Sequence, residues 1–154
     1  MDSLEQQAYS FGTMLVLVNR LQVLGDKLDE RVTLKQWLTI AVLLKSGASS
    51  LPLTELADRL GSSRQNVKKL VLLLEKQGFV ALNRDDSDAR ILRVRLTEHC
   101  MEYFAARDGK EARFMDALFH DFDPALTEGL YRGLVKLAEN IARMEDSASH
   151  EEKE

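Results

Sequence analysis

The first thirty residues carry apolar side chains with a helical period over a long stretch. The apolar positions on one face are Leu4, Ala8, Phe11, Leu15, Val18, Leu21 and Leu28, which predicts one helix from Leu4 to Leu28. Its other sides are apolar too, at Met14, Val16, Leu17, Val23 and Leu24. Such a helix must be buried on several sides. Either a deep core or a partner chain can bury it, and in a chain of 154 residues we favour a partner chain.

Two shorter helical patterns follow, each with its own start and stop. Thr33 and Gln36 have the spacing of a capping box, which predicts a helix from there to the turn at Gly47. Pro52 suits the entrance of the next helix, where a backbone N–H would have no partner. We expect that helix to end at Gly61, because glycine adopts the left-handed conformation of a helix C-terminus.

Another helix is predicted to run to about Gln77, with Ser62 or Ser63 as its capping residue. One apolar stripe with the spacing i, i+3, i+4, i+7 comprises Val67, Leu70, Val71 and Leu74. The opening turns of this helix are polar instead. Two helices joined by a glycine-containing turn, with a polar start to the second, are typical of a helix-turn-helix.

Two strand-like runs come next, from Phe79 to Arg84 and from Ile91 to Leu96. In the second run apolar and basic residues alternate, as in a strand with one buried face. The polar segment Asp85–Arg90 connects the runs. The pattern predicts a β-hairpin, the wing of a winged helix-turn-helix.

The remainder of the chain is predicted to be helical. One helix is expected from Thr97 to about Asp121, and Asp123 followed by Pro124 is a strong start for another. The polar residues 146–154 are expected to form a flexible tail. The fold class is therefore mainly α with a small β-hairpin wing, α+β overall.

The charge is unevenly distributed. The whole chain carries −4, but the segment from Arg59 to Arg95 has nine basic and four acidic residues, a net of +5 inside a remainder of −9. Such a segment can act as an electrostatic footprint for nucleic acid, or it can be a solvated surface. A single cysteine, no signal pattern and no apolar run of about 18 residues favour a cytoplasmic protein that does not span a membrane.

The polar first turns of the second helix of the helix-turn-helix supply the candidate DNA contacts. An α-helix fits the major groove of B-DNA, where arginine pairs with guanine and asparagine or glutamine pairs with adenine. The side chains in position are Arg64, Gln65, Asn66, Lys68 and Lys69. Ser63 and the helix N-terminus can donate to a phosphate. The same run also fits an ordinary solvated helix face.

The wing supplies a second candidate contact. Arg90 lies near the hairpin tip, and Asp88 stands two residues before it. The Asp88 carboxylate can hold the Arg90 guanidinium extended, and an extended arginine can enter the narrow minor groove. The alternative is a surface ion pair that contributes little.

The order of these elements and several short motifs resemble the MarR (multiple antibiotic resistance regulator) family. The matching residues are Leu56–Ser63, Val67, Leu70–Val71, Leu74–Val80, Asp88–Arg90 and Leu96–Glu98. They include the wing pattern Asp-x-Arg followed by Leu-Thr. The resemblance covers nearly the whole chain, although Cys100 lies near the point where the family has a glycine.

The resemblance implies a homodimer that binds a pseudo-palindromic site in double-stranded DNA. It divides the chain into an N-terminal dimerisation helix (1–32), a DNA-binding lobe (33–96), C-terminal dimerisation helices (97–145) and the tail. Many members are repressors that a small aromatic ligand releases from DNA. Here Phe11, Met14, Trp37 and Met101 are the candidates to line the ligand crevice, although each also suits plain core packing.

Other functions fit the sequence less well. We interpret Cys100 as a small buried residue rather than a redox switch. A reactive thiol needs a lowered pKa, and His99, its neighbour in sequence, points away from it on a helix. His99 with Cys100, and His120 with Asp121 and Asp123, lack the paired spacing of a zinc site. No catalytic or cofactor motif is present, so we expect no enzyme, cofactor or metal. A protein-interaction module on the same scaffold would usually carry aromatic or methionine anchors on this helix.

Overall fold

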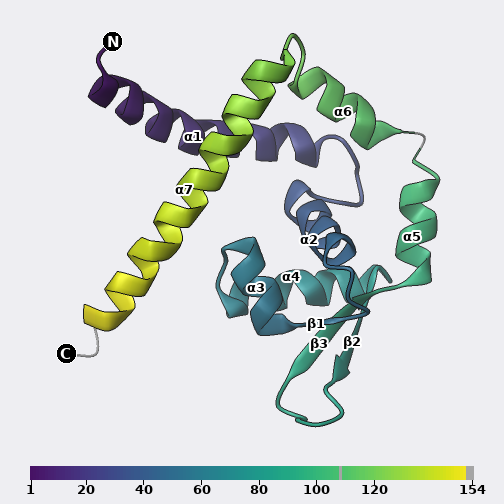
Figure 1. The fold of residues 1–154 in the computed structure, drawn as a ribbon. Helices are drawn as coiled ribbons and strands as arrows, with labels where there is room; N and C mark the ends of the chain where they lie inside the picture. The colour runs from purple at the N-terminus through teal and green to yellow at the C-terminus, as the bar shows by residue number, and fades with distance from the viewer. Residues whose placement is uncertain (108, 152–154) are drawn as a thin grey trace. The chain divides into compact units, whose positions relative to one another are not determined.

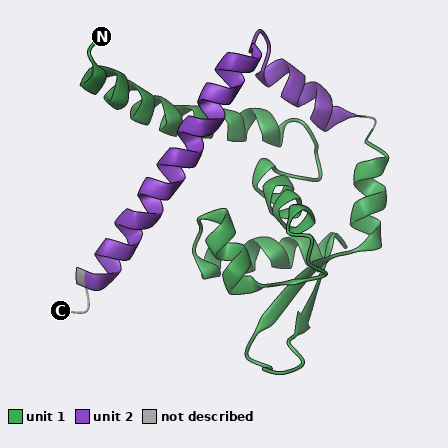
Figure 2. Cartoon of the chain, in the orientation of Figure 1, with its two compact units in different colours: residues 1–108 green, residues 109–154 purple. Residues whose placement is uncertain are grey.

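The computed structural model describes residues 1–107 and 109–151. Its elements are α1 (Ser3–Asp26), α2 (Leu34–Lys45), β1 (Leu51–Pro52), α3 (Leu53–Leu60), α4 (Arg64–Lys76), β2 (Val80–Arg84), β3 (Leu92–Leu96), α5 (Glu98–Ala105), α6 (Lys110–Leu118) and α7 (Pro124–Glu151) (Figure 1). The predicted fold class, mainly helical with a small hairpin, is confirmed. The chain forms two compact units, residues 1–108 and 109–154 (Figure 2).

Local capping residues set several helix starts, as the sequence predicts. Thr33 Oγ1 accepts the backbone N–H of Gln36 at 3.2 Å, and the Gln36 side chain accepts the N–H of Thr33 at 3.0 Å. Asp123 Oδ1 accepts the N–H of Leu126 at 2.7 Å at the start of α7. Gly61 ends α3 in the left-handed conformation, with φ +60°.

The core of the first unit lies between helices α2 to α5 and the sheet. Phe79 has no exposed surface, and the other fully buried large side chains are Leu53, Leu56, Leu74, Val67, Val71, Val94, Thr39 and Cys100. Three of the four residues in the predicted stripe of α4 are in this set, and Leu70 is half-buried beside them. The apolar stripe therefore holds α4 against the core.

The sheet has three antiparallel strands in the order β1-β3-β2. In the hairpin, Val80 pairs with Leu96 and Arg84 with Leu92. The two-residue strand β1 was not expected from the sequence; it pairs Leu51 with Val94 at the edge of the sheet. Pro52 fits there because an edge strand tolerates the missing N–H.

The predicted helix from Thr97 to Asp121 is wrong as a single element. It is divided into α5 and α6, and Gly109 stands between them with φ +73°, a left-handed conformation that suits glycine. At the other end, α7 continues as helix to Glu151, through residues assigned to the flexible tail. The last three residues of that tail lie outside the described part of the chain.

A buried ion pair joins the turn after α1 to the end of α5. Asp29 Oδ2 lies 3.2 Å from Arg107 Nη1, and their side chains are 8% and 6% exposed. The hydroxyl of Tyr103 donates to the same oxygen at 2.7 Å, and the backbone N–H groups of Arg31 and Val32 donate to Oδ1. Burial opposes the charge, but these hydrogen bonds and Arg107 hold the pKa of Asp29 below its ordinary value.

We expect Asp29→Asn to lower the free energy of unfolding by about 3 kcal/mol, because it removes the carboxylate that faces buried Arg107. Urea unfolding at neutral pH measures the loss, and Glu30→Gln, at an exposed neighbour, is the control. Since the pKa of Asp29 is lowered on folding, its stabilisation is present at neutral pH and is lost as the pH falls below about 4. Equal stability of the two variants at pH 7 would contradict the prediction.

Candidate nucleic-acid interface

Helix α4 has one buried side and one open side. Val67, Val71 and Leu74 are buried in the core. The five predicted DNA-contacting side chains of the opening turns are all exposed: Arg64, Gln65, Asn66, Lys68 and Lys69. The structure therefore places them on the surface at the start of one helix, where they are free to meet a ligand.

Ser63, and not Ser62, is the capping residue of α4. Its Oγ accepts the N–H of Asn66 at 3.1 Å, and its own hydroxyl hydrogen remains available to a phosphate. The N–H groups of the first turn and the helix dipole give this end a partial positive charge. The capped end is thus suited to a polyanion.

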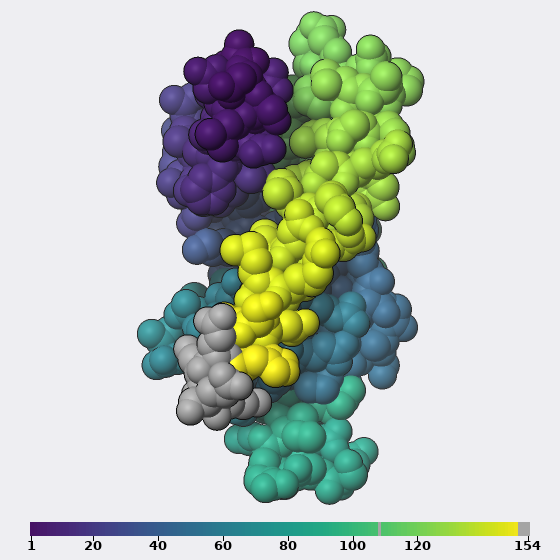
Figure 3. Space-filling view, turned by 60° about the vertical axis from the view of Figure 1, so that its left-hand side comes forward, coloured from purple at the N-terminus to yellow at the C-terminus, as the bar shows by residue number. Residues whose placement is uncertain are grey.

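The wing holds Arg90 in an ion pair with Asp88. The Nε and Nη2 of Arg90 donate to the two carboxylate oxygens of Asp88, both at 3.0 Å. The arginine side chain is nevertheless 91% exposed. The hydrogen bond from Arg90 lowers the pKa of Asp88, and the same bond raises the pKa of Arg90. The wing stands out at one end of the first unit (Figure 3).

A second arginine, Arg93, lies at the base of the wing. From the sequence it was expected only as one of the basic residues between Arg59 and Arg95. The Nε of Arg93 donates to Ser50 Oγ at 2.8 Å and its Nη1 to Asp85 Oδ1 at 3.2 Å. Asp85 also accepts the N–H groups of Ser87 and Asp88, and the hydroxyl and N–H of Ser87 are the main cause of its lowered pKa. The two-residue spacing of Asp85 and Ser87 is typical of a local turn. No sequence pattern indicates the contact between Arg93 and Ser50.

The basic residues of this lobe divide into two groups. Arg59, Arg90 and Arg93 each pair with a carboxylate. Six others have no ion-pair partner among the described residues: Arg64, Lys68, Lys69, Lys76, Arg84 and Arg95. Four of the six lie on α4, so the uncompensated positive charge is concentrated there.

Comparison with known proteins agrees with this arrangement. Residues 32–91 match the model of the MarR family. The chain carries a MarR-family winged helix-turn-helix domain. It is accordingly a DNA-binding transcriptional regulator.

Individual relatives cover more of the chain. The transcriptional activatory protein BadR of Rhodopseudomonas palustris is 29% identical over 126 residues, 79% of this chain and 71% of BadR. A MarR/EmrR family regulator from Acinetobacter sp. ADP1 has the same fold, with a TM-score of 0.76 at 22% identity over 89% of this chain and 97% of that one. BpsR of Bordetella bronchiseptica, whose structure concerns regulation of DNA binding by 6-hydroxynicotinic acid, has a TM-score of 0.70 at 18% identity over 82% and 91%.

In this chain the four predicted effector residues have different surroundings. Met101 lines a hollow of about 280 Å³ between the end of α2 and β3. Trp37 is half-buried and packs against the core. Phe11 is exposed on α1, and Met14 is half-buried. A shared crevice for these residues stays a prediction.

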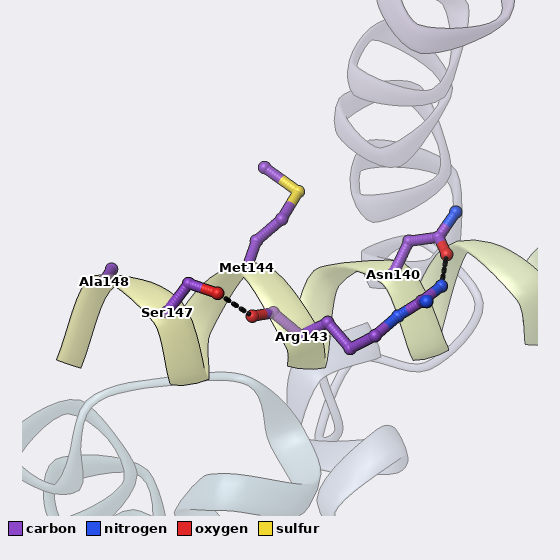
Figure 4. A pocket seen from close by; sticks show the side chains of 5 residues that line it. All are labelled: Asn140, Arg143, Met144, Ser147 and Ala148. Atoms are coloured by element: carbon purple, nitrogen blue, oxygen red, sulfur yellow. Dashed lines mark hydrogen bonds between the residues drawn. The ribbon is translucent and has the colours of Figure 1, made fainter. Parts of the chain in front are cut away.

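A larger hollow, of about 580 Å³, lies along the C-terminal part of α7. It is lined by Asn140, Arg143, Met144, Ser147 and Ala148, all from this one helix (Figure 4). Arg143 donates to the Asn140 side chain, and Ser147 donates to the carbonyl of Arg143 at 3.0 Å. Because a single helix forms all its walls, this hollow is helix surface rather than a ligand pocket.

The thiol of Cys100 is fully buried, and burial raises its pKa to about 11. It is therefore protonated and inaccessible at neutral pH, unlike a reactive thiol. His99 stacks on Phe79, with 5.5 Å between ring centroids. In the described ranges there is no group of three His, Cys, Asp or Glu side chains that could hold a metal, and no helix is long and apolar enough to cross a membrane.

Proposed function

We propose that the chain acts as a homodimer on a pseudo-palindromic operator, with α4 of each copy in the major groove and each wing in a minor groove. The dimer represses transcription until a small aromatic ligand releases it, and it acts in the cytoplasm. The observation that carries this proposal is the wing: Arg90 is bound by both oxygens of Asp88 and is still 91% exposed.

The start of α4 supports the major-groove assignment. Arg64 and Asn66 are exposed at the end of a capped helix, where a recognition helix contacts base edges. Arg64 can bind guanine O6 and N7, and Asn66 can bind adenine N6 and N7. Lys68 and Lys69 add charge for the phosphates.

The geometry of Arg90 supports the minor-groove assignment. Nε and one hydrogen of Nη2 are bound by Asp88, so Nη1 and the second hydrogen of Nη2 are free to donate. The pair fixes the orientation of the guanidinium before DNA binds, which lowers the entropy lost when it enters the groove. Narrow A·T-rich minor grooves attract such groups most strongly.

The long helices support the dimer. Helix α1 exposes apolar side chains along its length, including Leu4, Phe11, Val18 and Leu24, and α7 exposes Leu126, Leu134 and Ile141. Apolar surface of this extent favours a second copy as its partner. A two-fold axis would then set the half-sites about 34–36 Å apart.

Arg64→Ala is expected to weaken binding to the selected operator by about 1–3 kcal/mol and to relax the base preference at one position of each half-site, since the guanidinium reads a base. Fluorescence anisotropy on a panel of operator variants measures both effects. Lys136→Gln, which removes one exposed charge from α7, is the control. Unchanged affinity and unchanged base preference would show that Arg64 does not contact a base.

Arg90→Ala is expected to reduce affinity most on operators with A·T-rich flanks, because the negative potential of the minor groove is greatest there. The measurement compares operators that share both half-sites and differ only in flanking sequence. Arg90→Lys keeps the charge and serves as the matched variant. If all flanks lose affinity equally, the minor-groove role is wrong.

We expect light scattering at micromolar concentration to give twice the 17.5 kDa mass of the chain. Val18→Glu on α1 should weaken this association, because it places a charge on an apolar face. Exposed Lys27→Glu, near the end of the same helix, is the control for added charge. A folded monomer for the unaltered chain would contradict the dimer.

Repression and release are tested together with a reporter behind the selected operator. We expect the protein to lower expression and 6-hydroxynicotinic acid, or another small aromatic acid, to restore it, since the DNA binding of BpsR is regulated by 6-hydroxynicotinic acid. The assay must score both directions, because BadR is named an activatory protein. Higher expression with the protein present would overturn repression, and unaltered repression across a panel of aromatic acids would overturn release.

A further inference from the structure

Leu72 is an apolar side chain on the open side of α4. It is 46% exposed, and it lies away from the stripe of Val67, Val71 and Leu74 that enters the core. Residues three and four positions apart are neighbours on a helix surface. The four neighbours of Leu72 by this spacing are Lys68, Lys69, Glu75 and Lys76, all exposed. Three of them are basic, and the Glu75 carboxylate accepts the backbone N–H of Leu82. An exposed leucine alone says little; its place among these lysines points to DNA.

The spacing along α4 matches that of a helix that reads the major groove over two turns. A homeodomain recognition helix contacts DNA through residues at i, i+3, i+4 and i+7. Counted from Gln65, these positions are Lys68, Lys69 and Leu72. Three of the four positions are polar and exposed, so Leu72 is the apolar member of the set.

The chemistry of the groove offers this leucine one partner. Each base pair shows hydrogen-bond donors and acceptors in the major groove, and the C5-methyl of thymine is the apolar group among them. We propose that Leu72 packs against a thymine methyl group in each half-site and selects thymine at that position. The inference rests on the proposed placement of α4 in the major groove.

Leu73 provides a matched contrast on the same helix. It is 54% exposed, close to the value for Leu72. Its neighbours three and four positions away are Lys69 and Lys76, which it shares with Leu72, and half-buried Leu70 and Gln77. It therefore lies at the border between the open side of α4 and the side that packs on the core. Leu73→Ala thus removes an equal volume of exposed apolar side chain without touching the proposed contact.

The experiment uses the full chain and an operator selected from random duplexes. Each thymine of one half-site, and its symmetry mate, is replaced in turn by deoxyuridine, which lacks only the methyl group. We expect one position at which the replacement weakens binding about fourfold per half-site, the factor for burying one methyl-sized group. Leu72→Ala should lose this discrimination, whereas Leu72→Met and Leu73→Ala should keep it.

The outcomes separate this inference from the proposed function. Equal effects of deoxyuridine on the unaltered chain and on Leu72→Ala would overturn the contact, as would tight binding by the unaltered chain with no methyl-dependent position. Failure of the unaltered chain to bind any duplex would overturn the proposed function as well. Urea unfolding of Leu72→Ala and Leu73→Ala shows that both variants are folded, so a difference between them reports on DNA.

Discussion

The anchoring of α4 is the constraint on which the DNA-binding lobe depends. Val67, Val71 and Leu74 are buried along one side of the helix, and this fixes its rotation about its own axis. A rotation by one residue, about 100°, would bring Lys68 toward the core, where a lysine without a counter-charge is costly. The core therefore determines which side chains face outward. The side chains proposed to contact DNA and the side chains that pack in the core lie on two sides of the same helix.

Much of this arrangement could be predicted, because its signals are local. The cap at Ser63 and the Asp88–Arg90 pair each involve residues two or three positions apart. The break between α5 and α6 was missed although Gly109, a local signal for a helix end, lies there. The other failures involve distant residues. The Arg107 contact beyond α5 involves Asp29, far earlier in the chain. The strand β1 is too short for any period, and its partner β3 lies more than forty residues away.

Charge is distributed differently in space than along the chain. The segment from Arg59 to Arg95 is basic by count, but Arg59 and Arg93 are held by the carboxylates of Glu55 and Asp85. Their charges are compensated locally, and Arg93 also fastens the base of the wing. The excess is thus concentrated on α4 instead of being spread evenly. An acidic chain can carry such a surface because attraction to phosphates is local at physiological salt, where screening acts within about 8 Å.

The small strand β1 has a mechanical consequence. Through the Leu51–Val94 pair it ties the wing to the residues that lead directly into α3, and the Arg93–Ser50 bonds reinforce the tie. Because α3 in turn packs against α4, the wing and the recognition helix are held at a set separation. In the proposed complex, in which α4 and the wing both contact DNA, the duplex must bend or twist to match this separation. The stiffness of the DNA between the contacts then becomes part of the selectivity, at bases that no side chain touches.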